Sequence, residues 1–100
     1  MEIKNLEVVI HKAAISNIDD VRNYIISEGY PLNAQRFSER LFNFIYSLNT
    51  QPERYAICRY KRFAKRNLHC AVFETNYIIA YKIFKFKIVV HAVINGARLK

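Results

Sequence analysis

The sequence has little of the residues that interrupt regular structure, and it has no segment of the kind that enters a membrane. Its 100 residues include two glycines, two prolines and no tryptophan, which excludes a disordered or loop-rich scaffold. No apolar run approaches the ~20 residues needed to span a bilayer. Residues 1–5 also lack the apolar stretch of a secretory signal. We therefore expect one cytoplasmic domain, residues 1–100, with no membrane partner.

Cysteine is equally scarce. Cys58 and Cys70 are the only two cysteines, and although they could pair, cysteines in a cytosolic protein are more often reduced packing residues. A zinc site built from these two with His69 and His91 would need four convergent ligands, and the sequence has no CxxC or HxxxH spacing. We therefore expect reduced cysteines, no metal and no cofactor.

Acidic residues are nearly absent from the second half of the chain. Residues 54–100 hold eleven Lys and Arg residues and one acid, Glu74, and so carry a net charge of +10, whereas residues 1–53 carry −2. This basic half also has the alternation of β-strands, so its charge should lie on a sheet and its rims. Such a surface fits an anionic partner, either nucleic acid or an acidic protein segment. The alternative is a generally basic, soluble surface.

The first half predicts one strand and two helices. Leu6–His11 is short and β-branched, which is typical of a strand. Apolar residues recur at helical spacing over Lys12–Glu28, and Gly29 is placed to end this helix in the left-handed conformation. A second helix has a good N-cap in Asn33 and ends near Asn49. The apolar stripe that this helix should bury consists of Phe37, Leu41, Phe44 and Leu48.

Alternation with period two predicts three strands in the second half, Leu68–Phe73, Tyr77–Phe84 and Phe86–Ile94, joined by hairpin-length turns. On the last strand, alternate positions should share one face throughout; these are Ile88, Val90, Ala92 and Ile94. One face of the sheet should pack under the helices, and the other should be semi-polar and basic. The element order β-α-α-β-β-β predicts an α+β fold, in which an antiparallel two-helix hairpin packs on a mostly antiparallel four-stranded sheet.

In order, spacing and length these elements resemble the RelE/ParE superfamily, the toxins of type II toxin–antitoxin modules. The resemblance covers nearly the whole chain and rests on "HKAAISNIDDVRNYI", "AQRFSERLFNFIYSL", "YIIAYKI" and "KIVVHAVINGAR". The positions that match the family pattern are Tyr77, Ile79, Tyr81, Gly96 and Arg98. Two positions depart from it, because Ile78 stands where Arg is usual and Asn95 stands where His is usual.

The resemblance implies a growth-inhibiting toxin that is neutralised by a cognate antitoxin, whose acidic segment would cover the basic sheet. The family holds two activities. RelE-like members resemble ribosome-dependent, metal-free mRNA endonucleases, whereas ParE-like members poison DNA gyrase by binding it. The nucleases carry basic residues on the strand equivalent to Leu68–Phe73, where this chain has Ala71 and Phe73.

That missing basic pair favours the ParE-like, non-nuclease action. The strongly positive charge favours the ribosome and mRNA as the target, because ribosome binding rewards such charge. A RelE-like endonuclease is therefore the alternative, and whether the chain is an enzyme stays open. A non-toxic nucleic-acid-binding or interaction module on the same fold is a further alternative.

Six basic residues form the predicted target-binding set, and two residues would be catalytic if the chain is a nuclease. Arg98 matches the family motif and could clamp a phosphate or carboxylate, or it could be a solvated terminal arginine. His69 could act as a base, or it could be a strand histidine without a role. Phe63 could stack on a base or anchor its loop in the core. The target-binding set consists of Lys61, Arg62, Lys65, Arg66, Lys82 and Arg98.

Overall fold

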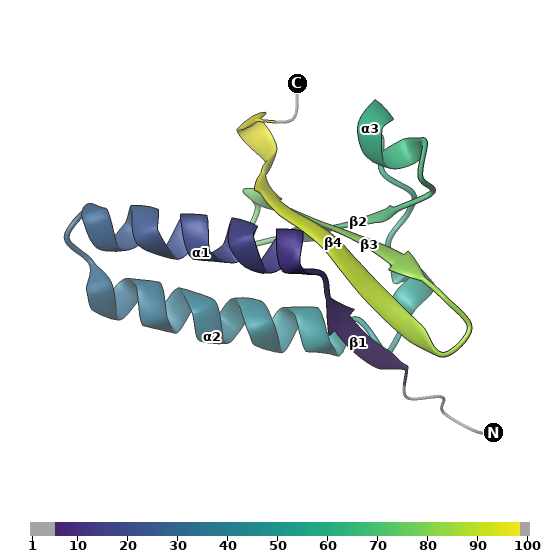
Figure 1. The fold of residues 1–100 in the computed structure, drawn as a ribbon, viewed down its shortest axis with the longest axis horizontal. Coiled ribbons are helices and arrows are strands. Elements are labelled where there is room, and N and C mark those ends of the chain that lie inside the picture. The colour runs from purple at the N-terminus through teal and green to yellow at the C-terminus, as the bar shows by residue number, and fades with distance from the viewer. Residues whose placement is uncertain (1–5, 99–100) are drawn as a thin grey trace.

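The computed structural model describes residues 6–98, and it has the predicted element order (Figure 1). The elements are β1 (Glu7–Ile10), α1 (Lys12–Ser27), α2 (Pro31–Ser47), a 3-10 turn η1 (Pro52–Arg54), α3 (Lys61–Ala64), β2 (His69–Phe73), β3 (Tyr77–Ile83), β4 (Lys87–Asn95) and a second 3-10 turn η2 (Gly96–Arg98). Within residues 6–98, no helix has both the length and the apolar character needed to cross a membrane.

The four strands form one mixed sheet in the order β1-β4-β3-β2. The pairs β2–β3 and β3–β4 are antiparallel, whereas β1 lies parallel to β4, with Val8 opposite Ile88. The hairpin of α1 and α2 covers one face of this sheet, and α3 lies on the other side (Figure 1). The α+β fold, the helical hairpin and the mostly antiparallel sheet are therefore confirmed.

The turn between the helices explains one difference from the prediction. Gly29 has a φ of +90°, the left-handed conformation expected of it. The next helix begins at Pro31 rather than after Asn33, because a proline with fixed φ and no N–H suits the first helical position. Tyr30 is the N-cap without a side-chain hydrogen bond, and Asn33 lies inside the first turn. The predicted N-cap was therefore wrong, although the helix itself was right.

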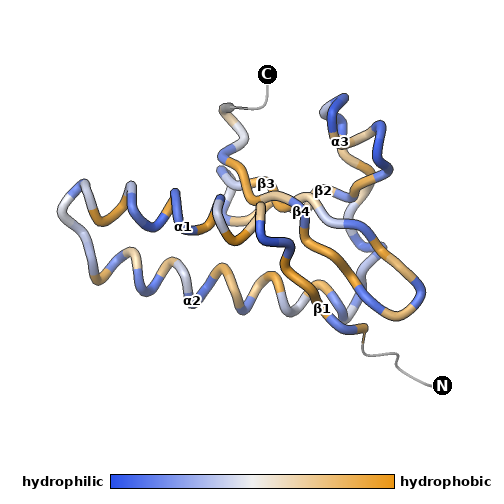
Figure 2. The backbone as a smooth tube through the Cα atoms, viewed as in Figure 1, coloured by the Kyte–Doolittle hydropathy of each residue, from blue (hydrophilic) through white to orange (hydrophobic). Residues whose placement is uncertain are grey.

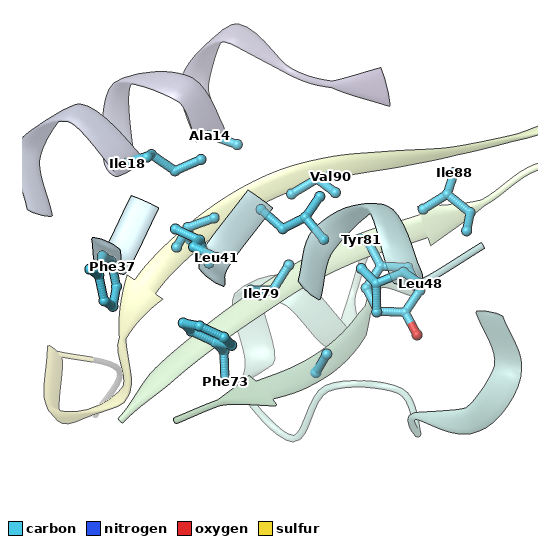
Figure 3. Close-up of a cluster of buried hydrophobic side chains, with 13 residues drawn as sticks. Ala14, Ile18, Phe37, Leu41, Leu48, Phe73, Ile79, Tyr81, Ile88 and Val90 are labelled. Carbon is cyan, nitrogen blue, oxygen red and sulfur yellow. The ribbon is translucent and has the colours of Figure 1, made fainter. Parts of the chain in front are cut away.

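The main core lies between the helical hairpin and the sheet (Figure 3). Leu41 is 0% exposed and sits among buried side chains of β3 and β4, such as Ile79 and Val90. The predicted stripe of α2 is confirmed as core, with Phe44 half-buried at its margin. The Tyr81 hydroxyl donates a 2.6 Å hydrogen bond to the carbonyl of Pro52, and burial raises the pKa of Tyr81 to about 12. Tyr81 is thus a packing residue that ties η1 to the sheet.

A β-bulge breaks the alternation expected on β4. Ala80 pairs with Ala92 while the next residue, Tyr81, pairs with Val90, so His91 is the extra residue on β4. A bulge of this kind turns the following side chains to the opposite face. Val93 therefore joins Val90 in the core under the helices. The expected strict alternation was wrong from residue 92 onward for this reason.

The second face of the sheet is also apolar at its centre, which the sequence did not predict. Phe63 and Leu68, from the segment that contains α3, pack on Ile78, Ala80 and Ala92. We call this side of the sheet the outer face. Figure 2 shows hydrophilic residues, in blue, at α3 and at the β3–β4 turn, on either side of this hydrophobic centre. The basic residues of α3 and of the β3–β4 turn therefore flank the apolar centre of the outer face.

Cys58 and Cys70 form a disulfide that fastens residues 58–68, which we call the α3 segment, to β2. The expectation of reduced cysteines is thus wrong for this structure. The reason is local pairing: Ile57 forms an isolated antiparallel bridge with His69, which brings the Cα atoms of the two cysteines to 4.8 Å. That separation lies within the range that a disulfide spans. Among residues 6–98, no three His, Cys, Asp or Glu side chains gather as ligands for a metal.

Candidate anion-binding face

The α3 segment displays cations around one buried aromatic ring. Phe63 is 4% exposed and anchors the segment in the apolar centre of the outer face, so this ring is core and is not free to stack on a base. The guanidinium of Arg62 lies 4.7 Å from the centre of that ring. Exposed basic residues surround this anchor; they are Lys61, Arg62, Lys65 and Arg66.

The side chain of Arg66 contacts that of His91 on the outer face, although the two residues are 25 positions apart in the sequence. The Arg66 Nη2 lies 3.2 Å from His91 Nδ1. A guanidinium has only donors, so it donates and His91 Nδ1 accepts, which leaves the imidazole proton on Nε2. The ring of His11, the N-cap of α1, stacks on His91 at 5.7 Å. Lys82 follows the inward Tyr81 on β3 and therefore points to the same outer face.

We call His11, Arg66, Lys82 and His91 the cationic cluster. Its charge perturbs the histidine at its centre. Partial burial lowers the pKa of His91, and the positive Arg66 beside it lowers this pKa further, with smaller contributions from His11 and Lys82. In the absence of a partner, the positive charges of the cluster are therefore not balanced by a negative charge beside His91 within residues 6–98.

The acids of the chain leave this charge uncompensated. Within residues 6–98 there are two salt bridges, Asp19–Arg22 on α1 and Arg40–Glu74. Glu74 is the one acid of the basic half, and it is hydrogen-bonded to the Arg40 guanidinium at 2.6 and 3.1 Å, which lowers the pKa of Glu74. No basic residue from Arg54 to Lys87 has a salt bridge inside the described range. The outer face can therefore hold an anion without displacing a carboxylate of the chain.

His69 lies away from the cationic cluster. It shares the helix-covered face of β2 with Ala71 and Phe73, and its ring stacks on Tyr81 at 5.4 Å. His69 Nδ1 lies 2.6 Å from the carbonyl oxygen of Tyr55, an acceptor, so this nitrogen donates its proton there. For Arg98, the structure describes only the backbone, in η2. The prediction that His69 and Arg98 act together therefore stays a prediction.

A groove elsewhere on the molecule is lined by an acidic residue rather than by basic ones. It is a groove of about 400 Å³ between α1 and the end of β4. Its lining includes the carboxylate of Asp20 and no Lys or Arg. The residues that line it are Asn17, Asp20, Val21, Tyr24, Tyr77, Val93, Ile94 and Asn95. An anionic partner therefore fits the outer face better than this groove.

Replacing Arg66 by glutamine should raise the pKa of His91, because the nearest positive charge is lost. Lys82→Gln should raise the same pKa less. Since the folded pKa is below the ordinary value, protons bind the unfolded chain more readily. The unchanged chain therefore loses folding stability as the pH falls below about 6.5. This loss is complete once the pH is below the pKa of His91 in the folded state. An NMR titration of the imidazole measures both shifts. A His91 pKa that stays unchanged in both variants would contradict the interaction of Arg66 and Lys82 with His91.

The comparisons with known proteins agree with this architecture. A family model described as the ParE toxin of the type II toxin-antitoxin system, parDE, matches residues 8–99. The match runs from the first strand to the penultimate residue, so it includes both faces of the sheet and the helical hairpin. No curated protein matches the sequence at a significant level.

Proposed function

Because the chain belongs to the ParE toxin family of type II toxin–antitoxin systems, we propose that it inhibits growth by binding DNA gyrase and that it does not cleave nucleic acid. The family assignment implies an antitoxin partner. The observation that carries the non-nuclease proposal is the burial of Ala71 and Phe73. These positions, where the nuclease pattern has basic residues, lie in the core under the helices.

The remaining histidines also support binding rather than catalysis. Metal-free RNA cleavage needs a base for the 2′-hydroxyl and an acid for the leaving oxygen, placed on either side of the phosphate. The rings of His11 and His91 are stacked face to face, which leaves no place for a phosphate between them. His69 is on the opposite face, and its Nδ1 is hydrogen-bonded to the carbonyl of Tyr55. The outer face thus offers cations to hold a charge but no flanking acid–base pair.

The same cations explain how one face could serve two partners. Unpaired positive charge speeds the approach of an acidic surface and weakens the approach of basic ones. An acidic antitoxin segment laid over the cationic cluster would therefore block the gyrase contact. Competition for this face is the simplest route from antitoxin binding to neutralisation.

Induced expression without the antitoxin should produce gyrase-linked DNA breaks while the mRNA stays intact. In a supercoiling assay with purified gyrase, the double variant Arg66→Gln/Lys82→Gln should need about tenfold more protein for the same inhibition. Each exposed charge is expected to contribute a sizeable fraction of a kcal/mol to the binding free energy, and the two together account for about tenfold. Arg22→Gln/Arg36→Gln is the matched control, since it removes the same charge from the helical hairpin.

Mapping of mRNA 5′ ends from the same cultures tests the RelE-like alternative. New ribosome-dependent cuts that disappear in His69→Ala and Arg98→Ala, with gyrase unaffected, would overturn the proposed function. Full inhibition by the cluster variant, equal to that of its control, would instead show that another surface binds gyrase.

A further inference from the structure

The turn between β3 and β4 presents two phenylalanines to solvent. Phe84 is 42% exposed and Phe86 is 70% exposed. The Phe84 N–H donates a 2.8 Å hydrogen bond to the carbonyl of Lys87, so the two rings are carried by a closed, tight turn rather than by a loose loop. Exposed rings on a backbone that is already ordered require little loss of backbone freedom on binding, which is typical of a contact site.

Three lysines lie against these two rings. The ammonium groups of Lys82 and Lys87 lie 5.8 and 5.6 Å from the centre of the Phe84 ring, and that of Lys85 lies 5.3 Å from the Phe86 ring. Glu7 stands opposite Lys87 in the register of β1 and β4, but it makes no salt bridge with it within the described residues. The tip therefore combines apolar rings with uncompensated positive charge.

Lys82 connects this tip with the cationic cluster. Its ammonium group adjoins the Phe84 ring, and its charge also acts on His91, which Arg66 contacts. The outer face thus carries a strip that begins with cations at Arg66 and ends with exposed rings at the β3–β4 turn. We call it the cation–aromatic strip.

We propose that the cation–aromatic strip binds single-stranded nucleic acid, with Arg66 and the lysines on the phosphates and with Phe86 and Phe84 stacked on bases. A positive groove that follows the backbone, together with rings on which bases stack, is how proteins bind single strands without reading sequence. This inference goes beyond the proposed function, because it requires no gyrase and no other protein.

Other anionic partners fit the strip less well. A duplex keeps its bases stacked on one another, so the two rings would have nothing to stack on and only the lysines would contribute. A lipid surface would take up the rings only together with the lysine ammonium groups that lie within 6 Å of them. A single strand alone offers a phosphate and an unpaired base at neighbouring positions, as the alternating Lys and Phe residues require.

The test uses the full chain and fluorescein-labelled oligo(dT) and oligo(U) of about 16 nucleotides, the upper end of the range for such sites. Fluorescence anisotropy should show that Phe86→Leu weakens binding about tenfold, because one base-stacking contact is lost. The slope of log affinity against log salt should not change in this variant. Lys85→Gln should instead reduce that slope by about 0.7, the value for one phosphate contact of a single strand.

Two further variants keep the test independent of folding. Phe86→Tyr retains an aromatic ring and should bind as the unchanged chain does. Tyr46→Leu, at an exposed position of α2, removes an aromatic ring far from the strip and should also have no effect.

The proposal fails if Phe86→Leu binds as tightly as Phe86→Tyr, or if an unlabelled duplex of the same length competes as well as the single strand. It also fails if Phe86 governs binding to phosphatidylserine-containing vesicles while oligonucleotide binding is absent. Because gyrase is not in the assay, failure here leaves the proposed function untouched, and failure in the supercoiling assay leaves this inference untouched.

Discussion

Replacing Leu41 by alanine should lower the free energy of unfolding by about 3 kcal/mol or more, within the range measured for buried leucines. Leu41 is fully buried where α2 meets the sheet, so the substitution removes three carbon atoms from the centre of the core and leaves a cavity that two rigid layers cannot easily close. Equilibrium unfolding in urea measures the change through the shift in midpoint at constant slope.

Leu32→Ala is the matched control, because it makes the same chemical change on the same helix at a position that is 56% exposed. It should change the free energy of unfolding by no more than about 0.5 kcal/mol. Equal losses in the two variants would mean that α2 does not pack on the sheet through the Phe37–Leu48 stripe.

Removing the disulfide should have an effect of similar size. The double variant Cys58→Ala/Cys70→Ala should lower the free energy of unfolding by about 2–3 kcal/mol, as expected for a cross-link that closes a loop of this length. The loss should be concentrated in the α3 segment, which the bond fastens to β2. Hydrogen exchange of the amides of Phe63 and Leu68, both bonded within this segment, would show it as faster local opening.

A reducing agent supplies the control for this prediction. A dithiol should destabilise the unchanged chain by about as much as the double substitution and should leave the double variant unaffected. If the purified chain instead titrates as two free thiols before any reductant is added, the bond is absent in solution. The expected losses would then shrink to the packing of the buried Cys58 side chain.

Much of the fold could be predicted because it depends on local patterns. The stripe on α2 repeats with the helical period, and Gly29 marks the end of α1, so both helices follow from neighbouring residues alone. The N-cap of α2 was misplaced because Asn33 and Pro31 both signal a helix start, and sequence proximity does not say which of the two signals prevails. The strands followed from alternation with period two, and their limits differ from the prediction by one residue at most ends.

What could not be predicted depends on contacts between distant residues. The bulge at His91 is visible only when β4 is laid against β3, because the count of residues on one strand exceeds that on the other by one. The burial of Phe63 depends on α3 folding back over Ile78, and the disulfide depends on the bridge between Ile57 and His69. No periodicity within a single segment carries this information.

In the candidate site, too, the features that depend on composition could be predicted and those that depend on contacts between distant residues could not. The sequence identified the cations of the second half and their lack of acids, so the charge of the outer face was predictable from composition. The contact between Arg66 and His91 was not, because it requires both the bulge and the position of α3. His11 was missed altogether, since its role comes from ending the strand that lies beside β4.

The parallel pairing of β1 with β4 has a consequence for how the protein is made. Glu7 and Lys87 are register partners eighty positions apart, so the first strand finds its place only when the last one is available. During translation the helical hairpin, whose contacts are local, can form early, whereas the sheet is completed only once β4 has left the ribosome. We therefore expect this domain to become competent to bind only after β4 has emerged, whereas the helical hairpin is present earlier.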